Sequence, residues 1–364
     1  MGGALRVGVV GAGKISGQYS ATLARLPELP VTAVTDLDAS RALALADQHP
    51  GARATSFEDL VAADDVDVVL NLTIPAQHAP VALAAIAGGK HVYGEKPLAA
   101  SGAEGRAMVA AAASNGVRAA CAPDTVLGTG VQTARAAVDA GVIGAPHAAT
   151  AFMTVPGHER WHPDPEFYYL PGGGPLLDMG PYYLTALVHL LGPVERVIGM
   201  SSRPRAERTI GDGPRAGTAF PVEIDTHISG VLRHASGVLT TLLMSFDVWA
   251  THLPWIELYG SAGSLSVPDP NYFAGDVRLF TRDSLEWTVL PPSAGYAGAG
   301  RGVGLLDLAE ALADDRPHRT GVDVALHVLD VMEAIGESAV SGGSVEIGTT
   351  CARPDAVEGL ITLP

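Results

Sequence analysis

An acid and a tyrosine stand four residues apart in the segment GGGPLLDMGPYY, residues 172–183. Pro175 suits the first turn of a helix because it lacks an N–H, and on such a helix Asp178 and Tyr182 share one face. A carboxylate can hold a substrate hydroxyl by a hydrogen bond, and a phenol can exchange a proton with that hydroxyl. Asp178 and Tyr182 are therefore candidate catalytic and substrate-binding residues. Packing of Tyr182 in a core is the alternative.

A lysine ends a predicted strand in the segment KHVYGEKP, residues 90–97. Ligands of open parallel sheets bind beyond the carboxyl ends of the strands. Glu95 and Lys96 are therefore expected at a cofactor. Lys96 could also bind a substrate hydroxyl and stabilise the alkoxide that forms as hydride leaves. A surface lysine paired with Glu95 is the alternative.

Residues 11–16, GAGKIS, follow the predicted buried strand LRVGVV and have the spacing G-x-G-x-x-S. Gly11 permits a tight turn and Gly13 permits close approach of a pyrophosphate. Lys14 and Ile15 lead into a helix whose N-terminus attracts the anion. The pattern predicts a dinucleotide site, with a glycine-rich turn of another α/β protein as the alternative.

An acid ends the second predicted strand, VTAVTD, 20 residues after Ser16. Asp36 stands where a carboxylate binds the adenosine ribose hydroxyls and repels a 2′-phosphate. The sequence therefore predicts NAD. NADP stays possible because Arg41, five residues further on, could reach a phosphate.

The loop RWHPDPEFYY, residues 160–169, is rich in side chains that bind sugars. Trp161 could stack on a pyranose ring and His162 could bind a hydroxyl. Simple packing is the alternative. The histidines and acids of the chain show no metal-ligand spacing such as H-E-x-x-H, so no catalytic metal is expected.

In the first third of the chain, the cofactor candidates must be positioned by alternating strands and helices. Predicted strands alternate with helices of about 10–15 residues up to residue 125, which is typical of a doubly wound parallel sheet. Short strand patterns joined by turns follow, and they predict an α+β domain with one large, mostly antiparallel sheet. The segment PPSAGYAGAGRG, residues 291–302, is expected to be an exposed loop. We expect domains at 1–125 and 126–364, with the C-terminal tail able to pack back on the first.

Composition excludes several classes of partner. The 364 residues carry a net charge of −16, which disfavours nucleic acid and anionic membranes because phosphate binding needs clustered Lys and Arg. No apolar run approaches the ~20 residues of a membrane span, and the glycine-broken start is unlike a signal peptide. The two cysteines cannot form a disulfide framework. A cytoplasmic location is expected.

The chain resembles the glucose–fructose oxidoreductase / inositol dehydrogenase / rhizopine-catabolism oxidoreductases over nearly its whole length. The matching segments are GAGKIS, NLTIPAQH at 71–78, AGGKHVYGEKPLA at 87–99 and GGGPLLDMGPYY. The resemblance implies a Rossmann domain followed by an open-faced antiparallel sheet. It also implies NAD(P)-dependent redox chemistry on sugars or polyols, a homodimer or homotetramer, and catalysis by Lys96, whose following proline is often cis.

One position departs from the common pattern of that family. Many members have D-x-x-x-H where this chain has Asp178 and Tyr182, which is similar to the tyrosine-bearing branch. Tyr182 is then expected to exchange the hydroxyl proton with help from Lys96, and the opposite assignment stays open. We expect the glycines at 172–174 to let the backbone pass close to nicotinamide and substrate.

The resemblance adds four cofactor candidates. Pro75 and His78 follow the strand VDVVLNLTI, where the family contacts the cofactor, and Thr73 lies near the end of that strand. Thr73 and Pro75 are expected to touch the ribose or the nicotinamide, and His78 could instead cap the following helix. Asp124, in the segment APDT at 122–125, is expected to face the nicotinamide.

Three functions follow from these observations. The first is an NAD-dependent dehydrogenase of a sugar, glycoside or polyol. The second is an aldose–aldose oxidoreductase that retains NADP. The third is a dinucleotide-binding regulator without turnover, which would be expected to lack the lysine or the acid/base residue.

Overall fold

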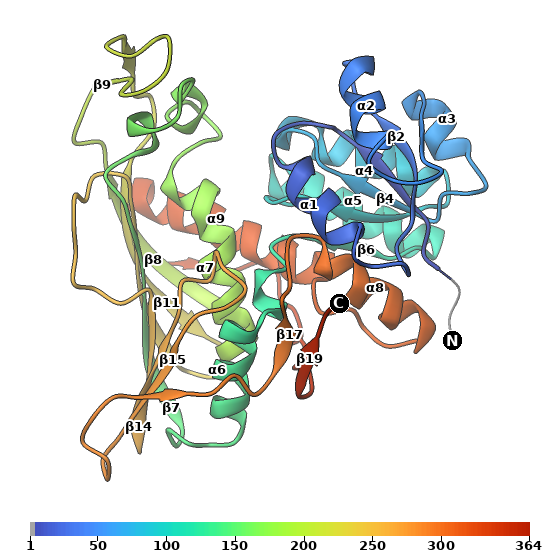
Figure 1. Ribbon diagram of the computed structural model, residues 1–364. Coiled ribbons are helices and arrows are strands. Elements are labelled where there is room, and N and C mark those ends of the chain that lie inside the picture. The colour runs from blue at the N-terminus through green and yellow to red at the C-terminus, as the bar shows by residue number, and fades with distance from the viewer. Residues whose placement is uncertain (1–3) are drawn as a thin grey trace. The chain divides into compact units, whose positions relative to one another are not determined.

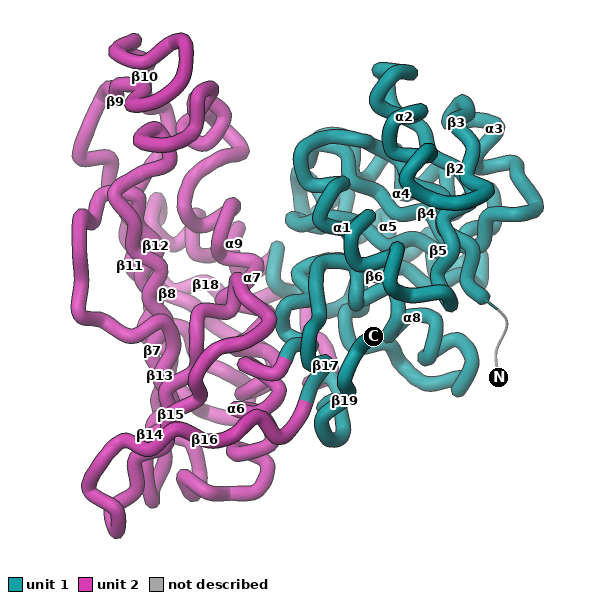
Figure 2. The backbone as a smooth tube through the Cα atoms, in the orientation of Figure 1, with its two compact units in different colours: residues 1–128, 295–329, 354–364 teal, residues 129–294, 330–353 magenta. Residues whose placement is uncertain are grey.

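The computed structural model describes residues 4–364, and contacts divide them into two compact units (Figure 2). Unit 1 comprises residues 4–128, Gly295–Leu329 and Pro354–Pro364. Unit 2 comprises Thr129–Ala294 and Asp330–Arg353. The expected boundary between two domains at residue 125 stays a prediction. By its contacts, the C-terminal tail belongs to unit 1.

Unit 1 is built on a six-stranded parallel sheet (Figure 1). Its order is β3-β2-β1-β4-β5-β6, so the chain starts in the middle and winds outward in both directions. Every residue of β1 and β4 is buried, as expected for parallel strands covered by helices on both faces. The strands are β1 (Val7–Val10), β2 (Val31–Thr35), β3 (Arg53–Ala54), β4 (Val68–Asn71), β5 (His91–Gly94) and β6 (Ala119–Cys121).

Helices α1 to α5 of unit 1 alternate with these strands along the chain, and α8 joins the unit from a later segment. Several begin at a side-chain cap, which satisfies an amide at the helix start: Ser101 accepts from the amide of Glu104 at 3.3 Å at the start of α5. They are α1 (Ser16–Leu23), α2 (Ala39–Ala46), α3 (Phe57–Ala62), α4 (Pro75–Ala87), α5 (Gly102–Asn115) and α8 (Val303–Ala313), with the 3-10 turn η1 (Thr125–Leu127).

Unit 2 is built on a nine-stranded sheet in the order β16-β15-β14-β13-β7-β12-β11-β8-β18. All neighbours pair antiparallel except β7 and β12, which are parallel. The strands are β7 (Pro146–Thr154), β8 (Val194–Ser202), β11 (His227–His234), β12 (Leu239–Ser245), β13 (Ile256–Gly260), β14 (Gly263–Val267), β15 (Val277–Thr281), β16 (Thr288–Leu290) and β18 (Val345–Glu346).

One face of this sheet is covered and the other is open (Figure 1). Buried and exposed residues alternate along β8, β11 and β12, as expected for a sheet with one solvent face, and the exposed positions include Ile198, Met200, Val231 and Leu239. The helices on the covered face are α6 (Thr129–Asp139) and α7 (Pro175–Leu191), with the later part of α9 (Val322–Ser341). The 3-10 turns η2 (His158–Arg160) and η3 (Glu166–Tyr168) precede α7.

Two small pairings complete the description. The strands β9 (Glu207–Thr209) and β10 (Ala219–Pro221) form a hairpin in unit 2, and β17 (Gly295–Ala297) pairs in parallel with β19 (Leu360–Thr362) in unit 1. The expectation of an exposed loop at 291–302 is therefore wrong around Tyr296. This tyrosine is buried, and its hydroxyl donates to Glu310 at 2.8 Å.

No helix among residues 4–364 combines the length and apolar character needed to cross a bilayer.

Candidate active site

The glycine-rich loop between β1 and α1 has open space beside Gly13 and close packing at Gly11. Gly11 has φ +98°, and a Cβ there would lie 2.9 Å from the carbonyl carbon and oxygen of Leu72, so only glycine fits. A Cβ on Gly13 would meet nothing within 4 Å. The protein's own packing therefore does not require Gly13, whereas close approach of a pyrophosphate does. The loop fits a dinucleotide.

Asp36 holds this loop from the end of β2. Its Oδ2 accepts from the amide of Ala12 at 2.6 Å, and its Oδ1 accepts from the amide of Asp38 at 2.8 Å. Each carboxylate oxygen can accept more than one hydrogen bond, so capacity remains for ribose hydroxyls. Arg41 lies 3.4 Å from Asp38 in an exposed ion pair at the start of α2.

The segment after β4 is fixed through His78. The Thr73 hydroxyl donates to Asn71 at 2.6 Å, and Pro75 is the first residue of α4. His78 is 2% exposed, with Nδ1 2.6 Å from the Pro97 carbonyl oxygen and Nε2 3.0 Å from that of Thr73. The suggestion that His78 caps α4 is wrong, because it lies within the helix. It ties the segment after β4 to the segment after β5.

Glu95 binds the backbone of Lys96 and a side chain of α1. Its Oε1 accepts from the Tyr19 hydroxyl at 2.7 Å and its Oε2 accepts from the backbone amide of Lys96 at 2.9 Å. Glu95 is 8% exposed, and these two hydrogen bonds join it to α1 and to the backbone of Lys96. The Lys96–Pro97 peptide is cis, as the resemblance implied.

Asp124 does not have the exposure that a nicotinamide contact requires. Its side chain is fully buried, and its Oδ2 accepts from the amides of Gly302 at 2.7 Å and Gly304 at 3.0 Å, at the start of α8. Burial raises the pKa of this carboxyl group. The expected cofactor contact is therefore corrected to a structural one, because a carboxylate that pairs with two backbone amides in the core is not available to a ligand.

In unit 2, α7 carries Asp178 and Tyr182 as expected, and the structure adds a histidine that sequence reasoning missed. His158 Nε2 lies 3.1 Å from Asp178 Oδ2. Both side chains keep some exposure, 14% for His158 and 19% for Asp178. Tyr182 is 4% exposed. Tyr183, the next residue, is fully buried, and its hydroxyl donates to Asp269 at 3.4 Å.

The glycines before α7 serve the loop that precedes them. A Cβ on Gly173 would lie 2.5 Å from the Phe167 carbonyl oxygen, and the amide of Gly174 donates to the Tyr168 carbonyl at 2.8 Å. The close approach that requires glycine is thus to the loop backbone. This contact brings the aromatic loop 158–169 against the start of the helix that carries Asp178.

Aromatic rings surround His158. Its ring centroid lies 4.4 Å from that of Tyr168, 4.5 Å from that of Phe246 and 5.3 Å from that of Trp161. Trp161 is 51% exposed, which leaves one of its faces accessible. His162 Nδ1 accepts from the Asp164 amide at 3.1 Å, so the loop itself orients this ring. Trp161 and His162 are thus brought near the Asp178–His158 pair.

A buried ion network holds the loop in place. The Arg208 guanidinium lies 2.7 Å from Glu159 and 2.6 Å from Asp247, and all three side chains are less than 10% exposed. The Tyr169 hydroxyl donates to Glu159 and accepts from the backbone amide of His158 at 3.0 Å. Burial raises the pKa of Tyr169. The network therefore fixes the backbone from which His158 reaches Asp178.

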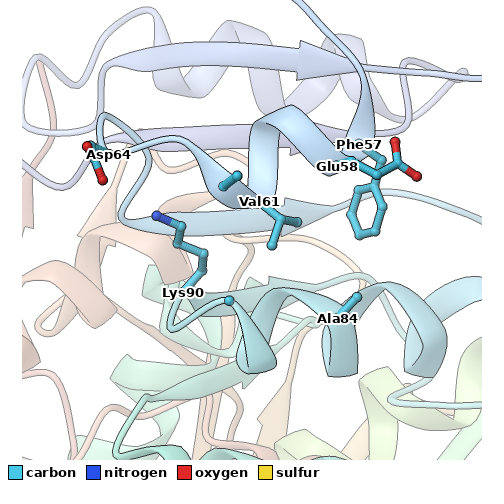
Figure 3. A pocket seen from close by; sticks show the side chains of 8 residues that line it. Phe57, Glu58, Val61, Asp64, Ala84 and Lys90 are labelled. Carbon is cyan, nitrogen blue, oxygen red and sulfur yellow. The ribbon is translucent and has the colours of Figure 1, made fainter.

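Unit 1 also has a hollow at the end of the sheet opposite the glycine-rich loop. Figure 3 shows it between α3 and α4, lined by Phe57, Val61, Asp64 and Lys90 among others. Lys90 immediately precedes β5 and its Nζ donates to the Ala63 carbonyl at 2.6 Å. The hollow is therefore at the amino ends of the strands, whereas the glycine-rich loop follows a carboxyl end. No metal-binding cluster of three or more His, Cys, Asp or Glu occurs among residues 4–364.

Comparison with known proteins gives matches over both units. Residues 5–122 match the model of the oxidoreductase family with an NAD-binding Rossmann fold, and residues 131–266 match the GFO/IDH/MocA C-terminal domain. The chain is 32% identical to 1,5-anhydro-D-fructose reductase of Ensifer adhaerens over 71% of this chain and 74% of that protein. It is 29% identical to dTDP-3,4-didehydro-2,6-dideoxy-alpha-D-glucose 3-reductase of Streptomyces antibioticus, over 82% and 87%. Its fold is similar to that of levoglucosan dehydrogenase in complex with NADH and L-sorbose, with a TM-score of 0.80, 20% identity, and coverage of 95% and 99%.

Proposed function

Because the chain belongs to the GFO/IDH/MocA family of NAD-binding oxidoreductases, we propose that it transfers hydride between NAD and a sugar, glycoside or polyol. The reacting carbon carries a secondary hydroxyl or is anomeric. The similar proteins named above, which are reductases and a dehydrogenase of sugars, support this substrate class. The observation that carries the proposal is the Asp178–His158 pair beside aromatic rings, because sugar sites combine fixed hydroxyl-binding groups with aromatic faces.

The residues that would hold the cofactor are those of unit 1. Gly11, Gly13 and the N-terminus of α1 bind the pyrophosphate, and Asp36 binds the adenosine ribose. Thr73 and Pro75 follow β4, one of the two middle strands of the sheet, and Lys96 follows β5, the next strand outward. These three residues are assigned to the nicotinamide end of the cofactor. When bound, NAD supplies the hydride acceptor.

The proposed chemistry at the substrate uses three side chains. Tyr182 takes the proton of the reacting hydroxyl, and Lys96 stabilises the alkoxide by its positive charge. Asp178 accepts a hydrogen bond from a substrate hydroxyl through Oδ1, since Oδ2 faces His158. His158 thereby orients the carboxylate, while Trp161 and His162 contact the rest of the sugar.

The proposal is tested by absorbance at 340 nm with NAD⁺ or NADP⁺ and a panel of aldoses, inositols, pyranosides and polyols. We expect turnover with NAD⁺ and one substrate class, lowered by more than about 100-fold in Lys96→Met and in Tyr182→Phe. Lys90→Met is the matched control, because Lys90 immediately precedes β5, at the opposite end of the sheet from the glycine-rich loop. Turnover that survives both substitutions would contradict the assigned roles.

Two other outcomes have distinct meanings. Cofactor that stays bound through purification and is reduced by one sugar and reoxidised by another would favour an aldose–aldose oxidoreductase. Tight NAD binding without hydride transfer to any substrate would favour the regulator.

We also propose that the protein is a cytoplasmic homodimer or homotetramer that does not bind nucleic acid. Support for assembly comes from the open face of the unit 2 sheet, where Ile198, Met200 and Val231 are 46%, 77% and 40% exposed on neighbouring strands. Apolar side chains gathered on one face are typical of an interface. A monomer mass in light scattering at working concentration would contradict the assembly.

A further inference from the structure

We infer that Arg301 is a cofactor-binding residue that pairs with the pyrophosphate of the bound dinucleotide. The inference concerns unit 1 alone and depends on NAD binding rather than on the proposed sugar chemistry. Arg301 lies far along the chain from the glycine-rich loop, in the segment Gly298–Gly304, and no motif of the loop points to it.

The segment 298–302 runs along one side of α1 toward its amino end. The Arg25 guanidinium donates to the Gly298 carbonyl at 3.0 Å. A Cβ on Gly300 would lie 2.5 Å from the Thr22 hydroxyl. The Arg301 Nε then donates to Gln18 Oε1 at 3.1 Å. Gln18 and Thr22 lie one turn apart on the same face of α1, and Arg25 lies just beyond the end of the helix at Leu23. The segment therefore approaches the phosphate-binding end of α1 from Gly298 to Arg301.

Gln18 is in the first turn of α1. It stands two residues after Ser16, the first helical residue, which is about 3 Å along the helix axis. The exposed loop residues Gly13 and Lys14 come immediately before. A guanidinium bonded to Gln18 is thus within one helical turn of the amides that attract a pyrophosphate.

The backbone that follows Arg301 is held by Asp124, a buried residue just after β6. Asp124 Oδ2 accepts from the amides of Gly302 and Gly304, directly after Arg301. A Cβ on Gly302 would lie 3.2 Å from the Tyr19 ring, so this segment lies tight against α1. Asp124, which has no exposed surface of its own, is therefore a positioning residue for Arg301.

Charges of both signs lie near this end of α1. Asp36 binds the Ala12 amide and is assigned to the ribose, and the buried Asp124 acts electrostatically on Arg301. The first turn of the helix carries no acidic residue. Lys14 precedes it and Arg301 lies beside it, in a chain whose net charge is −16. Arginine presents several donors in a planar fork that matches phosphate oxygens, and it is used widely for this purpose.

The test is isothermal titration calorimetry of the full chain with ADP-ribose and with adenosine. ADP-ribose contains the pyrophosphate but no nicotinamide, so binding is measured without turnover. We expect Arg301→Gln to weaken ADP-ribose binding by about 10- to 100-fold, as for loss of a charge-assisted hydrogen bond, and to leave adenosine binding within about 2-fold. Added salt should weaken ADP-ribose binding more steeply in the wild type than in the variant.

Arg53→Gln is the matched control, since Arg53 is an arginine of unit 1 that pairs with Asp65 just before β4, at the opposite end of the sheet from the glycine-rich loop. We expect it to bind both ligands as the wild type does. Unchanged ADP-ribose binding in Arg301→Gln would overturn the inference, as would equal losses for ADP-ribose and adenosine, which would indicate a packing role.

Arg301→Lys covers the case in which the glutamine variant fails to fold. It keeps the charge and loses the planar fork, so we expect ADP-ribose binding to weaken by about 3- to 10-fold with adenosine unchanged. No change for either ligand would overturn the inference. Failure of sugar turnover with intact ADP-ribose binding would contradict the proposed function and leave this inference standing.

Discussion

Replacing Arg208 by methionine should severely destabilise unit 2. The Arg208 side chain is 1% exposed and neutralises Glu159 and Asp247, which are 7% and 9% exposed. It also donates to the Phe246 carbonyl at 3.0 Å and lies 4.8 Å above the Tyr169 ring. Methionine restores much of the volume but leaves the buried Glu159 without a cation and leaves Asp247 with only the half-exposed Arg205, 3.9 Å away.

The expected cost follows from that uncompensated charge. Removing one partner of a buried ion pair costs about 3–5 kcal/mol. A domain's total free energy of unfolding is about 5–15 kcal/mol, so the variant should lose a large share of it. Because the network holds the backbone of His158 through Tyr169, the Asp178–His158 pair should also be disturbed.

Urea unfolding followed by tryptophan fluorescence measures this effect in the right unit. The chain has four tryptophans, at positions 161, 249, 255 and 287, and all lie in unit 2. The matched control is Arg215→Met. Arg215 also pairs with two carboxylates, Asp164 and Glu166, but its side chain is 46% exposed, so its unfolding midpoint should hardly move.

A midpoint for Arg208→Met within error of the Arg215→Met midpoint would refute this reasoning. A second check is rescue. Adding Glu159→Gln and Asp247→Asn to Arg208→Met removes the buried negative charges, so the triple variant should be more stable than Arg208→Met alone. Failure of rescue would mean that packing of the guanidinium, rather than its charge, matters.

Two further predictions concern unit 1. Asp36→Ser removes the carboxylate at the ribose position, so the ratio of the NAD⁺ to the NADP⁺ dissociation constant should rise by about 10-fold or more in calorimetric titrations; an unchanged ratio would contradict the role of Asp36. Burial lowers the pKa of His318, whose Nε2 lies 2.8 Å from the Ala119 carbonyl oxygen. Below the ordinary histidine pKa of about 6.5 the unfolded chain binds a proton that the folded chain does not, so stability should fall as pH drops from 7 to 5. His318→Gln should flatten that slope in urea midpoints measured across this range, and equal slopes in both proteins would contradict the assignment.

Local signals determined much of the fold and part of the site. The strand, glycine-rich turn and helix around Gly11 and Gly13 are contiguous in the chain, as are Pro175, Asp178 and Tyr182 on α7. Helix and strand periods repeat within a few residues, so a continuous segment carries enough information to predict its own conformation and which of its side chains share a face. The NAD-binding half and the helix with the candidate catalytic residues were therefore predictable.

Only the tertiary structure decided which side chains meet and which are buried. His158 is 20 residues from Asp178, and Arg208 is 39 residues from Asp247. Neither pair produces a repeating pattern in the sequence around its residues, so the pairing cannot be predicted from those segments. From the resemblance, Asp124 was expected to face the nicotinamide, yet it is buried against the start of α8, which comes from the last fifth of the chain. Arg301 reaches α1 across 283 residues. Such contacts depend on how elements pack in three dimensions, and no short segment of the sequence specifies that packing by itself.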